Sequence, residues 1–414
     1  MKQAVKILLM IVVILMSEKV YAAIEITDER ATADYWTQKN LNGDEIILSA
    51  QEISNLNKII SNRDEYSADL INFPQKITAE NLKNRIAKLT DDVKISDFQV
   101  GMENRNFDAI SSEVKILYAV TLERADIRIL PISWNGDIYD SLQGTAIDPA
   151  EPVAVMLESL DGKFVFVQSR NYFGWIEKNK LGFTTRENWK NYVKPKNFIV
   201  VTANKKTVEV DGKKILFQMG AVIPLEKNIE EKNFWLAKIP VIDGKNFREI
   251  TVKIAKDDTV HKNFLPCTTN NFIRQSFKFL GDVYGWGGLF ESVDCSAFTS
   301  DIYRSMGIEI PRDADRQEKI LPKLENFSNE KYEERLKILR KSPTGALLHK
   351  RGHVLMFLGN DDSGTPIAIH AASSYYLDDK KIYVRKILVS ALDYPNDYGV
   401  KTVENLTGIT FAKK

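Results

Sequence analysis

The sequence predicts a multidomain α+β protein, on three observations. Apolar residues recur at helical spacing up to about residue 112, short runs rich in Val, Ile and aromatics follow up to about 255, and both patterns occur after 256. The expected domains are a signal peptide at 1–22, a helical N-terminal segment at 23–112, two small all-β barrels at 113–183 and 184–255, and an α+β domain at 256–414.

The first 22 residues predict a secretory signal peptide. Lys2 and Lys6 precede the apolar run ILLMIVVILM, and Val20 and Ala22 are placed for a signal peptidase. The run is shorter than the about 20 residues that span a bilayer, and no cysteine follows it that could carry a lipid. We expect a mature chain from near Ala23, exported to the periplasm or secreted, without a stable membrane anchor. An uncleaved N-terminal anchor is the alternative.

Two amphipathic helices are predicted in the N-terminal segment. SAQEISNLNKII begins with Ser49 and has Glu52 three positions later, which is a capping-box pattern, and TAENLKNRIAKL begins with Thr78 as an N-cap. The expected apolar faces are Ile53, Leu56, Ile59 and Ile60 in the first helix and Leu82, Ile86 and Leu89 in the second. Nothing here indicates catalysis, so we expect a packing or clamp role.

The region from 113 to 255 predicts β-structure. Its strand-like runs are separated by the turn signals LDGK, VDGK and IDGK. Strands of this length and spacing favour small barrels, which we divide near residue 183; a single larger β-sandwich is the alternative.

The last region combines two helices with a hairpin. NNFIRQSFKFLG predicts a helix that ends at Gly281, and CSAFTSDIYRSMG predicts a second helix that ends at Gly307. The strand-like runs HVLMFLG and IAIHAA are joined by the turn-rich NDDSGTP.

Cys295 is the candidate nucleophile, within YGWGGLFESVDCSAF (284–298). Asp294 is a good N-cap, so the helix is expected to begin at Cys295. A thiol in the first turn lies near unpaired backbone N–H groups and the positive end of the helix dipole, which favour the thiolate. The same N–H groups can form an oxyanion hole, and the glycines of YGWGG are expected to let a substrate approach the backbone closely. A disulfide with Cys267, the other cysteine, is the alternative.

A base is expected among four histidines. His353 opens one predicted strand and His370 lies in the next. If these strands pair, the two imidazoles can be neighbours on one face, with His353 as base and His370 orienting it. A metal site is less well supported, because the histidines and carboxylates show no tight ligand spacing. The net charge of +1 without a basic cluster gives no support for nucleic-acid binding, and we expect no cofactor.

These residues resemble the NlpC family of bacterial cell-wall cysteine peptidases. The motifs are YGWGGLFESVDCSAF, GIEIPRDADRQ, GHVLMFLG and IHAA. The resemblance implies a papain-like domain with Cys295 as nucleophile, His353 as base and His370 as the third polar residue. It further implies substrate-binding roles for Tyr284, Asp294, Ser296 and Arg312, and matches Gln317 without a definite role. Asp294 and Ser296 would bind the free amine of an N-terminal L-Ala.

The resemblance extends to the region before the peptidase motifs. ESLDGKFVFVQSRNYFGWI and the stretch 197–253 resemble paired SH3-like barrels that follow a clamp-like helical segment in one subgroup. The resemblance therefore implies an exported hydrolase of peptidoglycan stem peptides. It would cleave the bond between γ-D-glutamate and a diamino acid, with diaminopimelate expected. The alternatives are a non-catalytic wall-peptide-binding protein and a papain-like acyltransferase or amidase.

Overall fold

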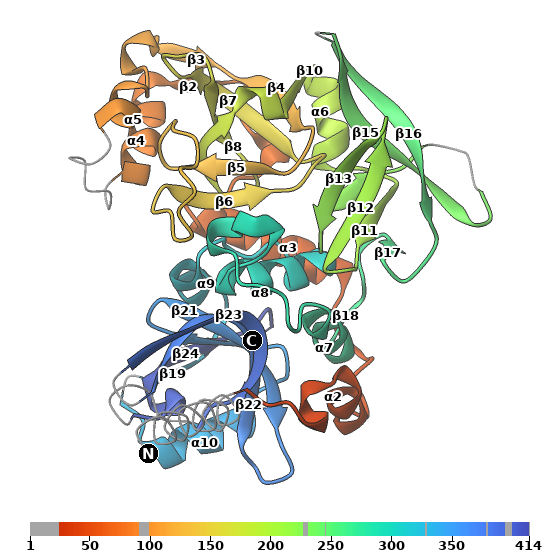
Figure 1. The fold of residues 1–414 in the computed structure, drawn as a ribbon, viewed down its shortest axis with the longest axis vertical. Helices are drawn as coiled ribbons and strands as arrows, with labels where there is room; N and C mark the ends of the chain where they lie inside the picture. The colour runs from red at the N-terminus through yellow and green to blue at the C-terminus, as the bar shows by residue number, and fades with distance from the viewer. Residues whose placement is uncertain are drawn as a thin grey trace, which may run out of the picture. The chain divides into compact units, whose positions relative to one another are not determined.

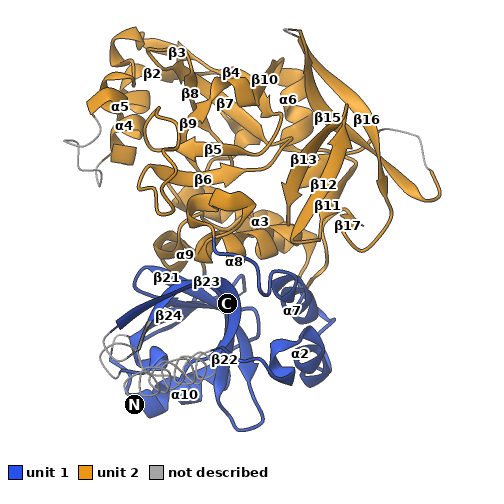
Figure 2. Cartoon of the chain, in the orientation of Figure 1, with its two compact units in different colours: residues 1–47, 268–284, 322–414 blue, residues 48–267, 285–321 orange. Residues whose placement is uncertain are grey.

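The structure is a computed structural model that forms two compact units (Figures 1 and 2). It describes residues 25–90, 99–226, 231–244, 246–327, 329–377, 380–393 and 400–413. The predicted signal peptide at 1–22 lies outside these residues. The first unit takes in residues 1–47, 268–284 and 322–414, and the second takes in residues 48–267 and 285–321. Two of the four unit boundaries fall within β1 (Ile46–Leu48) and β18 (Cys267–Thr268), and the other two fall after residues 284 and 321.

The first unit is built on a six-stranded antiparallel sheet. The strands, in spatial order, are β19 (Lys323–Asn326), β24 (Leu406–Thr410), β20 (Leu347–Lys350), β21 (His353–Asn360), β22 (Pro366–Leu377) and β23 (Lys380–Ala391). The predicted hairpin is confirmed as β21 and β22, with Met356 opposite Ile369. Residues 354–358 of β21 and 367–369 of β22 are buried on both faces of the sheet, so this hairpin lies in the core of the unit.

Helices α2 (Ala33–Lys39), α7 (Thr269–Phe277) and α10 (Tyr332–Leu339) also belong to this unit. Helix α7 begins as predicted but ends before Gly281. After Phe277 the chain forms tighter turns, in which the N–H groups of residues 278–280 donate to carbonyls three positions earlier, and the Gly281 N–H donates to the Ile387 carbonyl of β23.

The second unit contains a seven-stranded antiparallel sheet. Its order is β10 (Leu181–Thr184), β4 (Leu117–Thr121), β7 (Pro152–Glu158), β8 (Phe164–Gln168), β9 (Phe173–Glu177), β5 (Ala125–Arg128) and β6 (Gln143–Ile147). We call these strands the first barrel region. Phe166 and Trp175 are fully buried in it and pack edge to face.

Separate small sheets follow this region along the chain. β11 (Phe198–Val201) pairs with β14 (Val222–Pro224) and β17 (Val260–Lys262), while β12 (Lys205–Val210) pairs with β13 (Lys213–Gln218) and β15 (Phe234–Asp243) with β16 (Asn246–Ala255). The VDGK signal forms the β12–β13 turn, where Asp211 and Gly212 both have positive φ, as a tight hairpin requires. Helix α6 (Arg186–Val193), which the sequence analysis did not predict, separates the two groups of strands.

The helices predicted before residue 112 are present in this unit. They are α3 (Ala50–Arg63) and α4 (Ala79–Thr90). The short α5 (Gln99–Glu103) was not predicted, and β2 (Lys76–Thr78) pairs with β3 (Glu113–Lys115). The capping box of Ser49 and Glu52 is confirmed. Ile59 was wrongly assigned to the buried face, because it is 47% exposed while Leu56 and Ile60 are buried. Adjacent helix positions differ by about 100°, so a narrow contact face excludes it.

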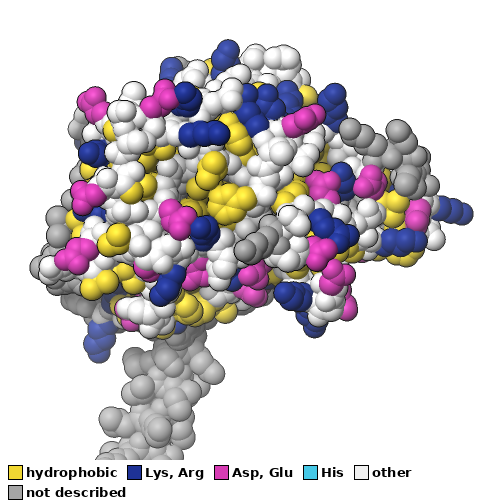
Figure 3. Space-filling model, turned by 90° about the horizontal axis from the view of Figure 1, so that it is seen from above, with side chains coloured by type: hydrophobic (Ala, Val, Ile, Leu, Met, Phe, Trp, Pro, Cys, Tyr) yellow, Lys and Arg dark blue, Asp and Glu magenta, His cyan; other side chains and the backbone are white. Residues whose placement is uncertain are grey.

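Helices α8 (Cys295–Ser305) and α9 (Ala314–Ile320) also belong to the second unit. In the described part of the chain, no helix has the length and apolarity needed to cross a membrane. On the face seen in Figure 3, basic and acidic side chains are interspersed with hydrophobic ones.

Candidate active site

The nucleophile candidate lies where the sequence places it, at the first residue of α8. The Ala297 backbone N–H donates to the Asp294 carboxylate at 2.8 Å, so the predicted N-cap is confirmed. Cys295 is buried, with 8% of its surface exposed. Both cysteines lie in the described residues and neither forms a disulfide, so the Cys267–Cys295 alternative is wrong in this structure. Cys267 is buried in β18.

Asp294 is bound by several protein groups besides its own helix. Arg312 donates to its two oxygens at 2.7 and 3.1 Å, and the Gly287 backbone N–H donates at 3.0 Å. The Ser296 hydroxyl donates to it at 3.2 Å. Burial alone would raise the pKa of Asp294, but the Arg312 charge and these hydrogen bonds outweigh burial and lower it. The carboxylate is therefore ionised and already paired.

Arg312 connects the start of α8 to the first barrel region. Its Nε donates to the Thr145 hydroxyl of β6 at 2.6 Å, and its Nη1 donates to the Ser296 hydroxyl at 2.9 Å. It is 5% exposed, and its pairing with Asp294 raises its pKa despite burial. The bonds to Asp294, Ser296 and Thr145 fix the guanidinium in place beside the nucleophile helix.

Gln317 braces α8 from α9. Its amide donates to the Ser296 carbonyl at 3.1 Å and to the Pro311 carbonyl at 2.9 Å, and its oxygen accepts from the Thr299 hydroxyl at 3.0 Å. The side chain is fully buried. These contacts give the Gln317 of the PRDADRQ motif a positioning function in the fold.

The glycines before Cys295 pack against the chain itself. In the short helical segment η6 (Trp286–Glu291), a Cβ on Gly287 would lie 2.5 Å from the Gln143 side chain, and one on Gly288 would lie 2.8 Å from the Ala146 Cβ. Both glycines also have positive φ. The expectation that they admit a substrate needs correction, because the close approach that they permit is to β6 of the first barrel region.

The first unit contains a chain of hydrogen-bonded side chains that begins at His353. The Nε2 of His353 lies 2.8 Å from the Nδ1 of His370, and the Nε2 of His370 lies 3.1 Å from the Ser390 hydroxyl of β23. His353 is partly exposed, whereas His370 and Ser390 are buried. The predicted proximity of the two imidazoles on adjacent strands is therefore observed.

Electrostatics keep both imidazoles neutral at pH 7. Burial lowers the pKa of His370 to about 3, with the Lys350 charge adding to the effect. Burial, followed by the charges of His370 and Lys350, also lowers the pKa of His353 well below its usual range. A neutral imidazole carries one N–H proton. If His353 Nε2 donates to His370 Nδ1, the proton of His370 is on Nε2, which then donates to the Ser390 hydroxyl. This tautomer leaves His353 Nδ1 unprotonated, as a base requires.

Tyr284 lies in the first unit at the boundary with η6. It is 5% exposed, and its backbone N–H donates to the Arg385 carbonyl at 2.9 Å. The predicted site residues are thus divided between the two units. Asp294, Cys295, Ser296 and Arg312 lie together in one, and His353 and His370 lie together in the other with Tyr284.

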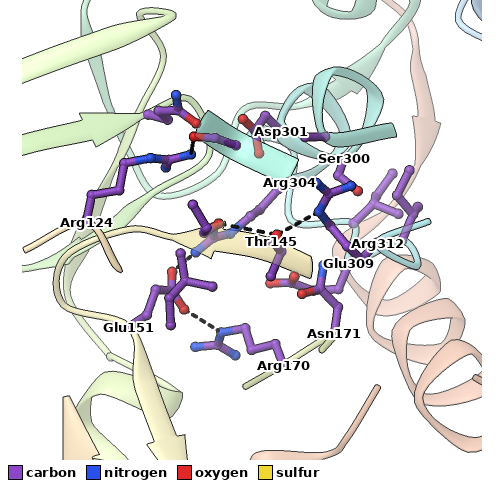
Figure 4. A pocket seen from close by; sticks show the side chains of 17 residues that line it. Arg124, Thr145, Glu151, Arg170, Asn171, Ser300, Asp301, Arg304, Glu309 and Arg312 are labelled. Atoms are coloured by element: carbon purple, nitrogen blue, oxygen red, sulfur yellow. Dashed lines mark hydrogen bonds and ion pairs between the residues drawn. The ribbon is translucent and has the colours of Figure 1, made fainter. Parts of the chain in front are cut away.

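Each unit contains a pocket lined by some of these residues. In the first unit a pocket of ≈ 180 Å³ is lined by His353 and His370. In the second, a cavity of ≈ 50 Å³ is lined by Arg312 and by an ionic network in which Glu151 pairs with Arg170 and Arg304 (Figure 4). Burial and the neighbouring Asp148 raise the pKa of Asp301, another lining residue, well above its usual range.

Ser390 and Thr145 were missed by sequence analysis. Ser390 is near His370 because β22 pairs with β23, with His370 opposite Leu388. Thr145 lies in β6, 167 positions before Arg312, and no local sequence signal connects the two residues. Among the described residues, no group of three or more His, Cys, Asp or Glu side chains could bind a metal ion.

The fold and the two side-chain clusters define a papain-like α+β domain combined with SH3-type β-structure. Residues 281–383 match the NlpC/P60 family, and residues 134–177 match the SH3 domain of SH3b1 type. The chain therefore contains an NlpC/P60 domain and an SH3b domain within a multidomain α+β architecture.

Known proteins extend this likeness. The chain is 28% identical over 191 residues to the gamma-D-glutamyl-L-lysine dipeptidyl-peptidase of Bacillus subtilis (strain 168), a match that covers 44% of this chain and 59% of that relative. A solved NlpC/P60 endopeptidase from Photobacterium damselae subsp. piscicida has a TM-score of 0.69 at 18% identity, covering 89% of this chain and 91% of that one. An NlpC/P60 family protein from Bacillus cereus ATCC 10987 has a TM-score of 0.50 at 18% identity, covering 72% and 100%. These structures resemble the chain in fold.

Proposed function

We propose that the protein is a cysteine endopeptidase that hydrolyses peptidoglycan stem peptides between γ-D-glutamate and a diamino acid. The observation that carries the proposal is a thiol at a capped helix start together with the hydrogen-bonded His353–His370 pair, both within the NlpC/P60 match at 281–383. Ser390, beyond the matched residues, extends this hydrogen-bonded chain. The named activity of the Bacillus subtilis relative supports the choice of bond.

The proposed reaction has two steps. His353 Nδ1 takes the proton of the Cys295 thiol, and the resulting thiolate attacks the γ-carbonyl carbon of D-glutamate. The C–N bond then breaks as the His353 imidazolium gives this proton to the leaving amine. Water, deprotonated by His353, then attacks the thioester and releases the γ-carboxylate and the thiol. His370 and Ser390 keep the imidazole in one orientation, and the helix N-terminus favours the thiolate and the oxyanion.

Stem peptides with a free N-terminal L-Ala are the proposed substrates. Asp294 and Ser296 are the proposed amine-binding residues. Tyr284 and Arg312, which lie in motifs that resemble those of the family, are proposed to contact the substrate as well. Asp294 already accepts two hydrogen bonds from Arg312. An incoming ammonium would therefore share the carboxylate with Arg312, so discrimination by Asp294 is expected to be weaker than for an unpaired carboxylate.

The rest of the chain fits an exported wall enzyme. We propose a signal peptide at 1–22, a clamp segment at 23–112, and SH3-like barrels at 113–183 and 184–255 that contact wall peptides before the catalytic domain at 256–414. The SH3b1 match at 134–177 supports the first barrel. A periplasmic or extracellular location follows from the substrate.

The test is mass spectrometry of L-Ala-γ-D-Glu-diaminopimelate after incubation with the mature protein. We expect release of L-Ala-D-Glu and diaminopimelate, loss of this release in Cys295→Ala, and most activity in Cys267→Ala. Undiminished turnover by Cys295→Ala would refute the mechanism. Peptide transfer to an added amine in preference to water would indicate an acyltransferase, and binding without cleavage would indicate a wall-peptide-binding protein.

A further inference from the structure

The pocket beside the imidazoles is basic. Its walls come from the β20–β21 turn, from β22 and from Leu388 of β23. The lining side chains are Lys350, Arg351, His353, His370, Ala372, Ser373, Ser374, Tyr375 and Leu388, with Gly352 in the turn. Two of them are cationic and none of these described lining residues is acidic. The pocket therefore presents positive charge together with hydroxyl groups.

Lys350 lies close to the imidazoles. It is the register partner of His353 across the β20–β21 hairpin. Its charge also contributes to the lowered pKa of both His353 and His370. Arg351 follows in the turn, is exposed and also lines the pocket.

The chemistry of the proposed reaction decides which part of a substrate reaches this pocket. His353 has to lie within hydrogen-bond reach of the amine that it protonates. That amine belongs to the diamino acid on the leaving side of the bond. The atoms attached to the same residue are therefore brought to the cavity that His353 lines.

We propose that Lys350 and Arg351 form a subsite that binds a carboxylate of the leaving diamino acid. The inference rests on the proposed function, since it takes His353 as the group that protonates the leaving amine. Paired cationic donors bind a carboxylate by charge-assisted hydrogen bonds, whereas they repel an ammonium. The subsite thus disfavours a lysine side chain, which ends in a positive charge.

Two carboxylates of the substrate have this chemistry. Diaminopimelate carries one at the end of its side chain, which lysine lacks, and either residue carries an α-carboxylate when it is the last residue of the peptide. Four peptides separate the two sources: L-Ala-γ-D-Glu followed by diaminopimelate or lysine, each as the α-acid and as the α-amide.

The experiment compares kcat/KM on these peptides for the wild type, Lys350→Met and Arg351→Gln. We expect the wild type to favour the peptide with the recognised carboxylate by about tenfold, the size of one charge-assisted hydrogen bond at a partly exposed site. Each variant is expected to lose most of that preference. Arg351→Gln alters an exposed turn residue, so it is expected to fold even if Lys350→Met does not.

The matched controls are the single variants Arg340→Gln and Lys341→Met, at an exposed basic pair at the end of α10 in the same unit. Each removes one charge, as each test variant does, and is expected to keep the wild-type preference. A preference that is unchanged in Arg351→Gln and in Lys350→Met, or lost equally in the controls, would overturn the subsite.

A binding measurement separates this inference from the proposed function. Titration of Cys295→Ala with free diaminopimelate and with free lysine, by calorimetry, reports on the subsite without turnover. Tighter binding of diaminopimelate that weakens in Arg351→Gln, with no hydrolysis of any peptide by the wild type, would uphold the subsite and refute the peptidase. Hydrolysis combined with binding that is indifferent to Lys350 and Arg351 would refute the subsite alone.

Discussion

Replacing Arg312 by methionine is expected to destabilise the start of α8, and the effect should depend on pH. The substitution leaves Asp294 buried with its hydrogen bonds from Gly287 and Ala297 but without its counter-charge. Removing one partner of a buried ion pair costs roughly 3–5 kcal/mol, so we expect a loss of that order in the free energy of unfolding at pH 7.

The pH dependence follows from the sign of the pKa shift of Asp294. In the wild type the folded pKa is lowered, so the contribution of Asp294 to stability is present above the unfolded value near 3.8 and is lost as the pH falls below it. Without the Arg312 charge, burial raises the pKa of Asp294 in the folded protein above its unfolded value. Ionising the buried carboxyl then costs free energy, so the variant loses stability as the pH rises above about 4. The destabilisation by Arg312→Met should therefore be smaller at pH 5 than at pH 7, by at most about 1.4 kcal/mol per pH unit.

Urea unfolding at pH 5 and pH 7, followed by tryptophan fluorescence and circular dichroism, measures both quantities. Arg248→Met is the control, because Arg248 forms an exposed pair with Asp243 in the same unit, and its loss should change stability by about 1 kcal/mol or less. A destabilisation by Arg312→Met below about 1 kcal/mol, or one of equal size at both pH values, contradicts the reasoning.

Four further outcomes are expected. His353→Ala should be nearly inactive while His370→Asn keeps measurable kcat, because an orienting group is less essential than the base; the opposite order would exchange the two roles. Stability of the wild type should fall as the pH drops from about 6.5 towards about 3, because His370 stays neutral when folded but gains a proton when unfolded, and His370→Asn should flatten this loss in acid unfolding curves. N-acetylation of L-Ala-γ-D-Glu-diaminopimelate should lower kcat/KM, and equal rates on both peptides would remove the amine-binding role of Asp294. Thr145→Val should lower kcat/KM on the stem peptide, because it removes the hydroxyl that accepts from Arg312, and an unchanged kcat/KM would contradict this positioning role.

Local sequence signals were sufficient for the start of α8 and for the hairpin. The N-cap of α8 depends on one side chain and a backbone N–H three positions later, so Asp294 and Ala297 could be paired without any knowledge of the fold. His353 and His370 are on consecutive strands joined by a short turn, and their proximity follows from hairpin pairing alone.

Partners distant in sequence could not be predicted. The Ser390 hydroxyl meets His370 through the register of a third strand, and Thr145 meets Arg312 across 167 positions of the chain. Tertiary packing also explains why glycine is required at positions 287 and 288, since the loop that contains Gly287 and Gly288 packs closely against β6. A sequence pattern indicates that a glycine is needed but not which neighbour requires it.

The first barrel region takes part in supporting the nucleophile helix. Gln143 donates to the Gly287 carbonyl at 3.1 Å, and Thr145 accepts from Arg312, so β6 contacts both the loop before Cys295 and the arginine that pairs with its N-cap. All these groups lie in one compact unit. A barrel that served only to bind the wall could be removed without affecting the thiol, whereas removal of β6 would leave the Arg312 Nε without its acceptor and Gly287 without its packing partner. The strand is therefore a structural part of the Cys295 environment.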